Sequence, residues 1–149
     1  RFGEIDQQAW DDLTASNYRA PLFLAQACYP ALKQSSGCII NLIDIYASLP
    51  LIHHSVYCSA KAANQMLVKS LALELAPEVR VNGISPGAIL WPTEETDDEQ
   101  NYKKALLEQV PLKRRGTPQA ISETALFLAT NDYITGEIIR VDGGRLLSA

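Results

Sequence analysis

A tyrosine and a lysine stand four residues apart in this chain, and together they could handle protons. Tyr57 and Lys61 lie near the start of a predicted helix, where residues four apart share a face. A lysine ammonium beside a phenol favours the phenolate and lowers the pKa of the phenol, which yields a proton donor or acceptor usable near neutral pH. Taken alone, the spacing favours the plainer interpretation, a surface tyrosine beside a surface lysine.

An aspartate precedes this pair and gives it context. Asp44 ends a predicted strand over residues 38–43, thirteen residues before Tyr57. In open α/β sheets, ligands bind outside the carboxyl ends of the strands. We therefore expect Asp44 and Tyr57 to face one crevice. The alternative role for Asp44 is to cap the loop that follows the strand.

A third candidate, Asn17, depends on a proline. Residues 6–33 predict a long helix that begins at the N-cap Asp6, kinks at Pro21 and stops near Pro30. Because Pro21 has no N–H, the carbonyl of Asn17 loses its helical partner and could hold a water molecule. A water near Lys61 would let protons pass to solvent. The alternative is a kink that serves packing only.

The remaining elements must position these residues. The pattern predicts strands over 38–43, 79–84 and 137–141, alternating with helices over 6–33, 55–76, 101–109 and 117–130. Such alternation is typical of a parallel α/β sheet, and the apolar run 38–43 predicts a strand buried on both faces. The helix over 55–76 is apolar on more than one side, which predicts packing between the sheet and a partner. Three strands alone would leave apolar edges uncovered, so we expect the second half of a larger domain.

Composition excludes several classes. The chain has 149 residues, is 47% hydrophobic and carries a net charge of −4. Its only basic run is residues 113–115, so no nucleic-acid partner is expected. No apolar stretch approaches the roughly 20 residues that cross a bilayer, and no export signal is visible at the N-terminus. Three cysteines without a CxxC pair, and two adjoining histidines, predict no metal site and fit a reducing cytoplasm.

Several ordered motifs together resemble the short-chain dehydrogenase/reductase family. They are Asn17, Asp44, Tyr57, Lys61, Ser85-Pro86-Gly87 and Val141-Asp142-Gly143-Gly144. The family's active tetrad is Asn, Ser, Tyr and Lys, and Asp44 stands where most members carry the serine. That replacement, together with the run from Pro86 through Trp91 to Pro92, resembles the pteridine reductase branch. The resemblance extends over essentially the whole chain.

The resemblance implies an architecture: the second half of a Rossmann-type doubly wound parallel sheet with helices on both faces. Residues 1–149 would be the C-terminal part of a single domain. The glycine-rich loop, the residues that choose NADP over NAD and the pterin-stacking residue would then lie before residue 1.

The resemblance also implies roles for the tetrad. Tyr57 would donate the proton during hydride transfer from NADPH. Lys61 would hold the nicotinamide ribose and lower the pKa of Tyr57. Asn17 would anchor a proton-relay water, and Asp44 would hydrogen-bond the pterin or assist proton delivery.

Further roles fall on the segments after the second and third strands. Pro86 and Gly87 would run beside the nicotinamide, and the backbone of Ile89 would reach its carboxamide. Trp91 stands where many relatives have a threonine and is expected to wall the substrate pocket; the alternative is a hydrophobic plug in a loop. The Asp142-Gly143-Gly144 segment is expected to form a tight turn at a subunit contact.

The resulting functional prediction is a cytoplasmic, NADPH-dependent reductase of a pterin or folate-type ring, assembled as a homo-oligomer and specifically a tetramer. Residues 1–149 alone are expected to be inactive. Two alternatives stay open. One is a short-chain reductase of another carbonyl substrate, such as a sugar, a steroid or an acyl thioester. The other is a non-catalytic binding or assembly module.

Overall fold

A three-stranded parallel sheet forms the centre of the chain. The computed structural model describes residues 1–90 and 97–148. The strands are β1 (Cys38–Leu42), β2 (Arg80–Pro86) and β3 (Ile138–Val141), and their spatial order is β1-β2-β3. Ile39 pairs with Val81, and Ile84 pairs with Ile139. All three predicted strands are thus confirmed, in parallel orientation.

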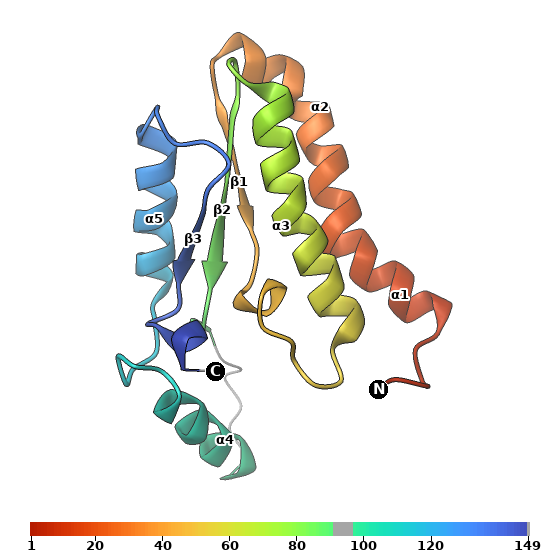
Figure 1. Cartoon of the computed structure of the whole chain (residues 1–149), viewed down its shortest axis with the longest axis vertical. Coiled ribbons are helices and arrows are strands. Elements are labelled where there is room, and N and C mark those ends of the chain that lie inside the picture. The colour runs from red at the N-terminus through yellow and green to blue at the C-terminus, as the bar shows by residue number, and fades with distance from the viewer. Residues whose placement is uncertain (91–96, 149) are drawn as a thin grey trace.

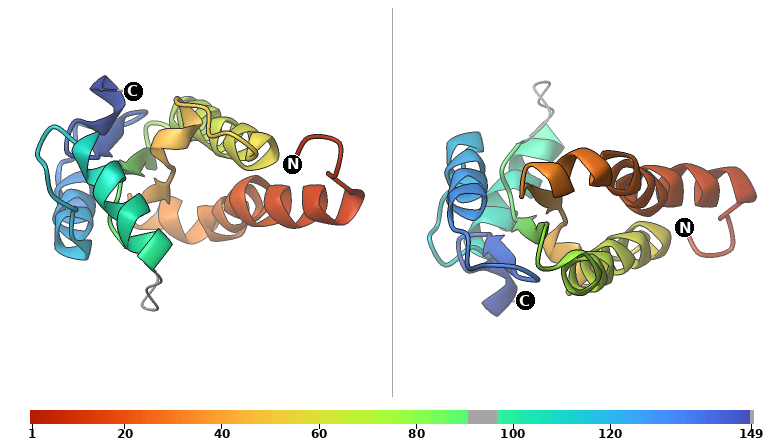
Figure 2. Two further views of the ribbon diagram at one scale, coloured as in Figure 1. Left: turned by 90° about the horizontal axis from the view of Figure 1, so that it is seen from below. Right: turned by 90° about the horizontal axis from the view of Figure 1, so that it is seen from above.

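Helices cover both faces of this sheet. The helical elements of the described residues are α1 (Gln7–Thr14), the π-helical turn η1 (Ala15–Arg19), α2 (Ala20–Gln34), α3 (Ser55–Leu75), α4 (Asp97–Glu108) and α5 (Pro118–Thr130). Helices α2 and α3 lie side by side on one face, and α5 lies on the other (Figures 1 and 2). The three strands point toward the same end of the molecule, where α4 lies (Figure 1). The predicted doubly wound arrangement is therefore confirmed.

The apolar core lies between the sheet and the α2–α3 layer. Its buried cluster consists of Ala25, Ile43, Leu67, Val68, Leu71, Ala72 and Val81. Strand β2 is the central strand and is buried over most of its length, with Val81 and Ile84 fully covered. Burial of these side chains, at about 25 cal/mol per Å² of apolar surface, is what fixes α3 on the sheet.

Strand β1 departs from the sequence-based expectation. A continuous apolar run predicted burial on both faces, but Ile39 and Ile40 are half-buried and Leu42 is 56% exposed. The reason is position: within the described residues β1 is an edge strand, paired with β2 alone. The prediction of a doubly covered strand, made for residues 38–43, is wrong for β1.

The first helical stretch also differs in detail. We expected a kink at Pro21, whereas the irregularity is the π-helical turn η1, which ends two residues before it. Pro21 is the second residue of α2, which continues directly from η1, and it has no N–H to donate to the turn before it. Pro30 does not stop the helix, since α2 continues to Gln34. A proline restricts the turn that precedes it, so the residues that follow remain free to stay helical.

Some element boundaries differ from the sequence-based expectation, whereas two helix N-caps agree with it. Helix α4 begins at Asp97 rather than at residue 101, and β2 runs on to Pro86 because that residue pairs with Val141. Two short 3-10 helices were not predicted, η2 (Ile45–Ala47) and η3 (Arg145–Leu147). The caps at Asp6 and Thr117 are confirmed by hydrogen bonds of 2.8 Å and 3.2 Å from backbone N–H groups in the first turns.

Candidate active site

Asp44 and Tyr57 meet at the carboxyl end of β1. The Tyr57 hydroxyl donates to Asp44 Oδ2 at 2.5 Å. The second carboxylate oxygen, Oδ1, accepts from the backbone N–H of Tyr46 at 3.0 Å and so caps η2. The two interpretations of Asp44 are therefore both correct: it caps the following turn, and it faces the tyrosine.

Lys61 lies one helical turn further along α3. Its Nζ donates to the carbonyl oxygen of Leu42 at 3.1 Å and lies 5.8 Å from the centre of the Tyr57 ring. An ammonium has three N–H donors, so two remain after the bond to Leu42. Burial lowers the pKa of Lys61, and the nearby Asp44 carboxylate partly opposes this effect.

The pKa of Tyr57 moves in the opposite direction from the one expected. Burial of the phenol raises it most, followed by the hydrogen bond to Asp44 and the charge of that carboxylate. In this arrangement the expectation that Lys61 lowers the pKa of Tyr57 is wrong, because burial and the hydrogen-bonded Asp44 carboxylate both raise this pKa. The phenol therefore keeps its proton at neutral pH.

Asn17 reaches the same region from the π-helical turn. Its side-chain N–H group donates to the Leu13 carbonyl and to Ser16 Oγ, both at 3.0 Å. Asn17 and Lys61 line one cavity of about 530 Å³. The structure thus brings Asn17 and Lys61 to a common space; the water expected between them remains a prediction.

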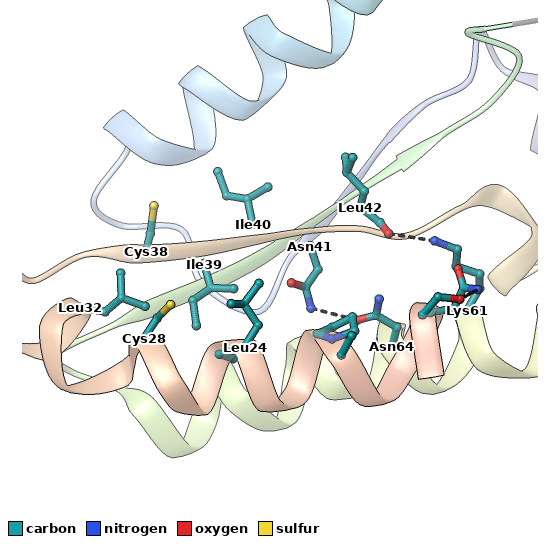
Figure 3. A pocket seen from close by; sticks show the side chains of 15 residues that line it. Leu24, Cys28, Leu32, Cys38, Ile39, Ile40, Asn41, Leu42, Lys61 and Asn64 are labelled. Carbon is teal, nitrogen blue, oxygen red and sulfur yellow. Dashed lines mark hydrogen bonds between the residues drawn. The ribbon is translucent and has the colours of Figure 1, made fainter. Parts of the chain in front are cut away.

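This cavity follows the whole length of β1 (Figure 3). At one end Lys61 and Asn64 of α3 face β1, and the Asn41 side chain donates to Asn64 Oδ1 at 2.9 Å. At the other end Leu24, Cys28 and Leu32 of α2 make an apolar wall (Figure 3). The cavity is therefore polar beside Lys61 and apolar farther along.

The loop after β2 is held tightly against β3. The Gly87 N–H donates to the Val141 carbonyl at 3.0 Å, and a Cβ on Gly87 would stand 2.7 Å from Asp142 Cα. Only glycine fits at such a distance. Ile89 is buried, and a Cβ on Gly116 would stand 2.5 Å from its Cδ1. Pro86, Gly87 and Ile89 are therefore fixed near the strand ends, whereas Trp91 lies outside the described residues.

The predicted tight turn near the C-terminus is confirmed. Asp142 accepts backbone hydrogen bonds from Gly144 at 2.8 Å and from Leu146 at 2.9 Å. Gly143 and Gly144 have φ values of +65° and +86°, which other residues adopt only with strain. The expected subunit contact at this turn stays a prediction.

The sequence analysis missed Arg145 and Asn64, which lie near this site. Arg145 donates to Tyr46 Oη at 2.8 Å, and no spacing could signal a bond between residues 99 positions apart. Asn64 is 2% exposed inside an apolar helix. The sequence did offer one signal for it. Asn41 also lies inside an apolar strand, and because buried amides require hydrogen-bond partners, the two asparagines could have been predicted to pair.

Residues 1–90 and 97–148 contain no cluster of three or more histidine, cysteine, aspartate or glutamate side chains suited to a metal ion. Within the same residues, none of the helices combines the length and apolar character needed to span a bilayer.

Parallel strands with helices on both faces, and an Asp–Tyr–Lys group at the strand ends, define a Rossmann-type α/β protein. Residues 1–145 match a family model described as enoyl-(acyl carrier protein) reductase. The chain belongs to the short-chain dehydrogenase/reductase family.

Three curated relatives show the range of this likeness. The chain is 34% identical to L-xylulose reductase of Mus musculus, over 97% of the chain and 62% of the relative. It is 36% identical to pteridine reductase 1 of Leishmania tarentolae, over 92% of the chain and 50% of that relative. It is 38% identical to 3-oxoacyl-(acyl-carrier-protein) reductase FabG of Staphylococcus epidermidis, over 94% of the chain and 59% of that relative. The family is confirmed, and the pteridine reductase branch is one of several that fit.

Solved structures agree with the fold. An apo SCOR enzyme from Clostridium thermocellum matches with a TM-score of 0.84 and 34% identity, over 97% of this chain and 56% of that one. A small-chain dehydrogenase in complex with NADPH matches with a TM-score of 0.87 and 28% identity, over 97% of this chain and 66% of that one. The chain spans about 50–62% of the length of the three curated relatives.

Proposed function

We propose that this chain is the C-terminal part of a single short-chain dehydrogenase/reductase domain that reduces a small molecule with NADPH. The observation that carries the proposal is the grouping of Asp44, Tyr57 and Lys61 at the carboxyl end of β1. A protonated phenol beside an ammonium is the arrangement that a proton donor needs.

The uncovered side of β1 supports the domain assignment. β1 is half-buried and borders a cavity of about 530 Å³, although its residues are strongly apolar. An apolar edge of this kind is covered in stable sheets. The relatives are longer than the match, and in our proposal the preceding part of the domain, with its glycine-rich loop, covers this edge.

The residues present fit a nicotinamide cofactor. Lys61 keeps two N–H donors for ribose hydroxyls after its bond to Leu42. Tyr57, Pro86, Gly87 and the backbone of Ile89 lie at the strand ends, where nucleotides bind in such sheets. NADPH, when bound, supplies the hydride. The NADPH-bound small-chain dehydrogenase supports the choice of cofactor.

Tyr57 then supplies the proton. As the substrate atom gains negative charge, the Tyr57 O–H bond breaks and the proton moves to that atom. The Lys61 ammonium offsets the negative charge left on the phenolate oxygen. Asp44 must release the hydroxyl for this transfer, because a carboxylate hydrogen-bonded to a phenolate would bring two negative charges together. A water held near Asn17 would return a proton from solvent through Lys61.

For the substrate we propose a pterin or folate-type ring. An ionised carboxylate only accepts hydrogen bonds, and such rings present amino and N–H donors that Asp44 can bind. The oxygen of a simple ketone or sugar carbonyl is an acceptor, which Asp44 cannot serve when ionised. Asp44, Tyr57 and Trp91 would contact the ring, and the likeness to pteridine reductase 1 is in accord.

A second candidate has a specific observation in its favour. L-xylulose reductase and 3-oxoacyl-(acyl-carrier-protein) reductase are comparably similar to the chain. A carbonyl compound such as a sugar or an acyl thioester is therefore the alternative substrate.

Activity of the full-length gene product separates the candidates. We expect NADPH-dependent turnover of dihydropterins and weaker turnover with NADH. Turnover of ketones or sugars without any pterin turnover would favour the second candidate. Failure to bind NADPH would reject both and leave a non-catalytic binding or assembly module.

Oligomeric state is a separate proposal. The exposed apolar side chains Phe23 of α2 and Met66 and Leu73 of α3 are 56%, 60% and 83% exposed. Faces of this kind mark interfaces between subunits, and we propose a homotetramer. Light scattering at micromolar concentration should show more than one subunit, and a monomer would contradict the proposal. The free thiols Cys28, Cys38 and Cys58 suit a cytoplasmic location.

A further inference from the structure

A second cavity adjoins the candidate active site. It measures about 260 Å³ and lies between η2, α4 and η3, with Tyr46, Leu51, Tyr102, Gln109 and Arg145 among its lining residues. Tyr46 joins it to the site, because its backbone N–H donates to Asp44. The Tyr46 phenol also contributes to the raised pKa of Tyr57. A molecule held in this cavity would therefore lie beside the Asp44–Tyr57 pair.

The cavity contains a buried cation. Arg145 is only 9% exposed, and its guanidinium lies 5.4 Å from the centre of the Tyr46 ring. In the described part of the chain, Tyr46 Oη is its one hydrogen-bond acceptor and no carboxylate forms an ion pair with it. Burying an arginine is costly unless its charge is paired. The aromatic face supplies only part of that compensation.

The guanidinium also has unused donors. It carries five N–H groups in a planar fork that matches two oxygens of a carboxylate or a phosphate. One N–H group is used by Tyr46. Tyr102 and Gln109 add polar groups to the cavity wall. Leu51 adds an apolar surface, against which the apolar part of a bound molecule could pack.

We propose that Arg145 anchors an anionic oxygen group, a carboxylate or a phosphate, that the substrate carries at a distance from the group being reduced. This inference rests on the proposed reductase function and narrows its substrate class. The polar walls and the buried cation select a negatively charged substituent, whereas the Asp44–Tyr57 pair acts on the reducible part of the same molecule.

Matched substrate pairs test the inference in the full-length protein. Each pair shares one reducible group and differs in charge: dihydrofolate against its diethyl ester for a carboxylate, and dihydroxyacetone phosphate against dihydroxyacetone for a phosphate. We expect kcat/KM of the wild type to favour the charged member of one pair, which identifies the anion. In Arg145→Met this preference should fall at least about tenfold, mainly through KM, because a charge-assisted bidentate contact is lost.

Two further variants separate binding from support of η2. Arg145→Lys keeps the charge and should retain part of the preference. Tyr46→Phe removes the Tyr46 hydroxyl but not the cation, so the preference should persist. An equal loss of kcat/KM for both members of a pair in Arg145→Met would show a merely structural role and overturn the proposal. An increased KM for NADPH in this variant would assign Arg145 to the cofactor and also overturn it.

A measurement without turnover keeps the two proposals distinct. If no substrate is reduced, the proposed function fails, and calorimetric titration with inorganic phosphate and with glutarate then tests the pocket. Binding of either anion to the wild type, with at least a tenfold weaker Kd in Arg145→Met, would support the anion site. Absence of binding to the wild type, or equal binding to both proteins, would overturn it.

Discussion

The two halves of α3 have different roles: the first positions site residues and the second packs in the core. The N-terminal half carries Tyr57 and Lys61, which are half-buried and bonded to Asp44 and to the Leu42 carbonyl. The C-terminal half carries Leu67, Val68, Leu71 and Ala72, which are buried in the core cluster. One rigid helix thus joins a polar, partly open site to an apolar anchor.

The chemistry of the site and the stability of the fold can therefore be changed by separate substitutions. The core half holds the helix on β2, and its rigid geometry then sets where the phenol and the ammonium stand. Substitutions of Tyr57 and Lys61 should alter the reaction with little effect on folding. Substitutions in the C-terminal half should do the reverse. Asn64 lies between the two halves and bonds to β1.

The largest effect is expected at Tyr57. In Tyr57→Phe the proton donor is lost while the ring remains, so kcat should fall about 10²–10⁴-fold. Tm and NADPH affinity should stay close to those of the wild type. Steady-state kinetics, a thermal melt and NADPH titration measure the three quantities. Tyr133→Phe, at a residue 98% exposed, is the matched control and should change none of them. Full activity in Tyr57→Phe would remove Tyr57 from the mechanism.

The core half is tested next. Leu71→Ala should lower the free energy of unfolding by about 2–5 kcal/mol, because it leaves a cavity between α3 and the sheet. The kcat of the protein that remains folded should not change. Urea unfolding of the full-length protein provides the measurement, with the exposed Lys69→Ala as control. A large loss of kcat without a loss of stability would break the division between the halves.

A smaller effect is expected from Asp44→Ser. Pterin reduction should fall about tenfold, because charged hydrogen bonds contribute about 1.5–3 kcal/mol. The carboxylate raises the pKa of Tyr57, so its removal lowers that pKa. Reduction needs the protonated phenol and is lost as pH rises through its pKa. The alkaline limb of the rate profile should therefore move to lower pH.

The matched control is Asp12→Ser, at an exposed aspartate of α1, which should leave the pH profile unchanged. Unaltered pterin turnover in Asp44→Ser would mean that the Asp44 carboxylate plays no role in pterin reduction. An alkaline limb that moved to higher pH would contradict the cause assigned to the raised pKa of Tyr57.

The smallest effect is expected at the boundary between the halves. Asn64→Ala leaves the half-buried Asn41 amide without its partner and should cost about 1 kcal/mol of folding free energy. Gln65→Ala, which loses only an exposed 3.3 Å bond to Ser48, is the control and should be nearly neutral. Denaturant unfolding of both variants makes the comparison. Equal destabilisation would show that the amide pair adds nothing.

Much of this molecule was predictable from local patterns. The three strands, helix α3 and the caps at Asp6 and Thr117 follow from apolar periodicity and from side chains that bond nearby N–H groups. The meeting of Asp44 with Tyr57 was also predictable, since a strand end and the start of the next helix face one edge of a parallel sheet. A kink was predicted at Pro21, whereas the irregularity is the π-helical turn η1 before it, because a proline does not fix how the preceding turn adjusts.

What the sequence alone determined is the order of the elements and the identity of the reacting groups, because both depend on residues close together in the chain. Tertiary structure decided the exposure of β1, the direction of the Tyr57 pKa shift and the burial of Arg145 against Tyr46. These properties depend on which distant atoms exclude water and which charges lie nearest. Neither quantity is encoded in local spacing.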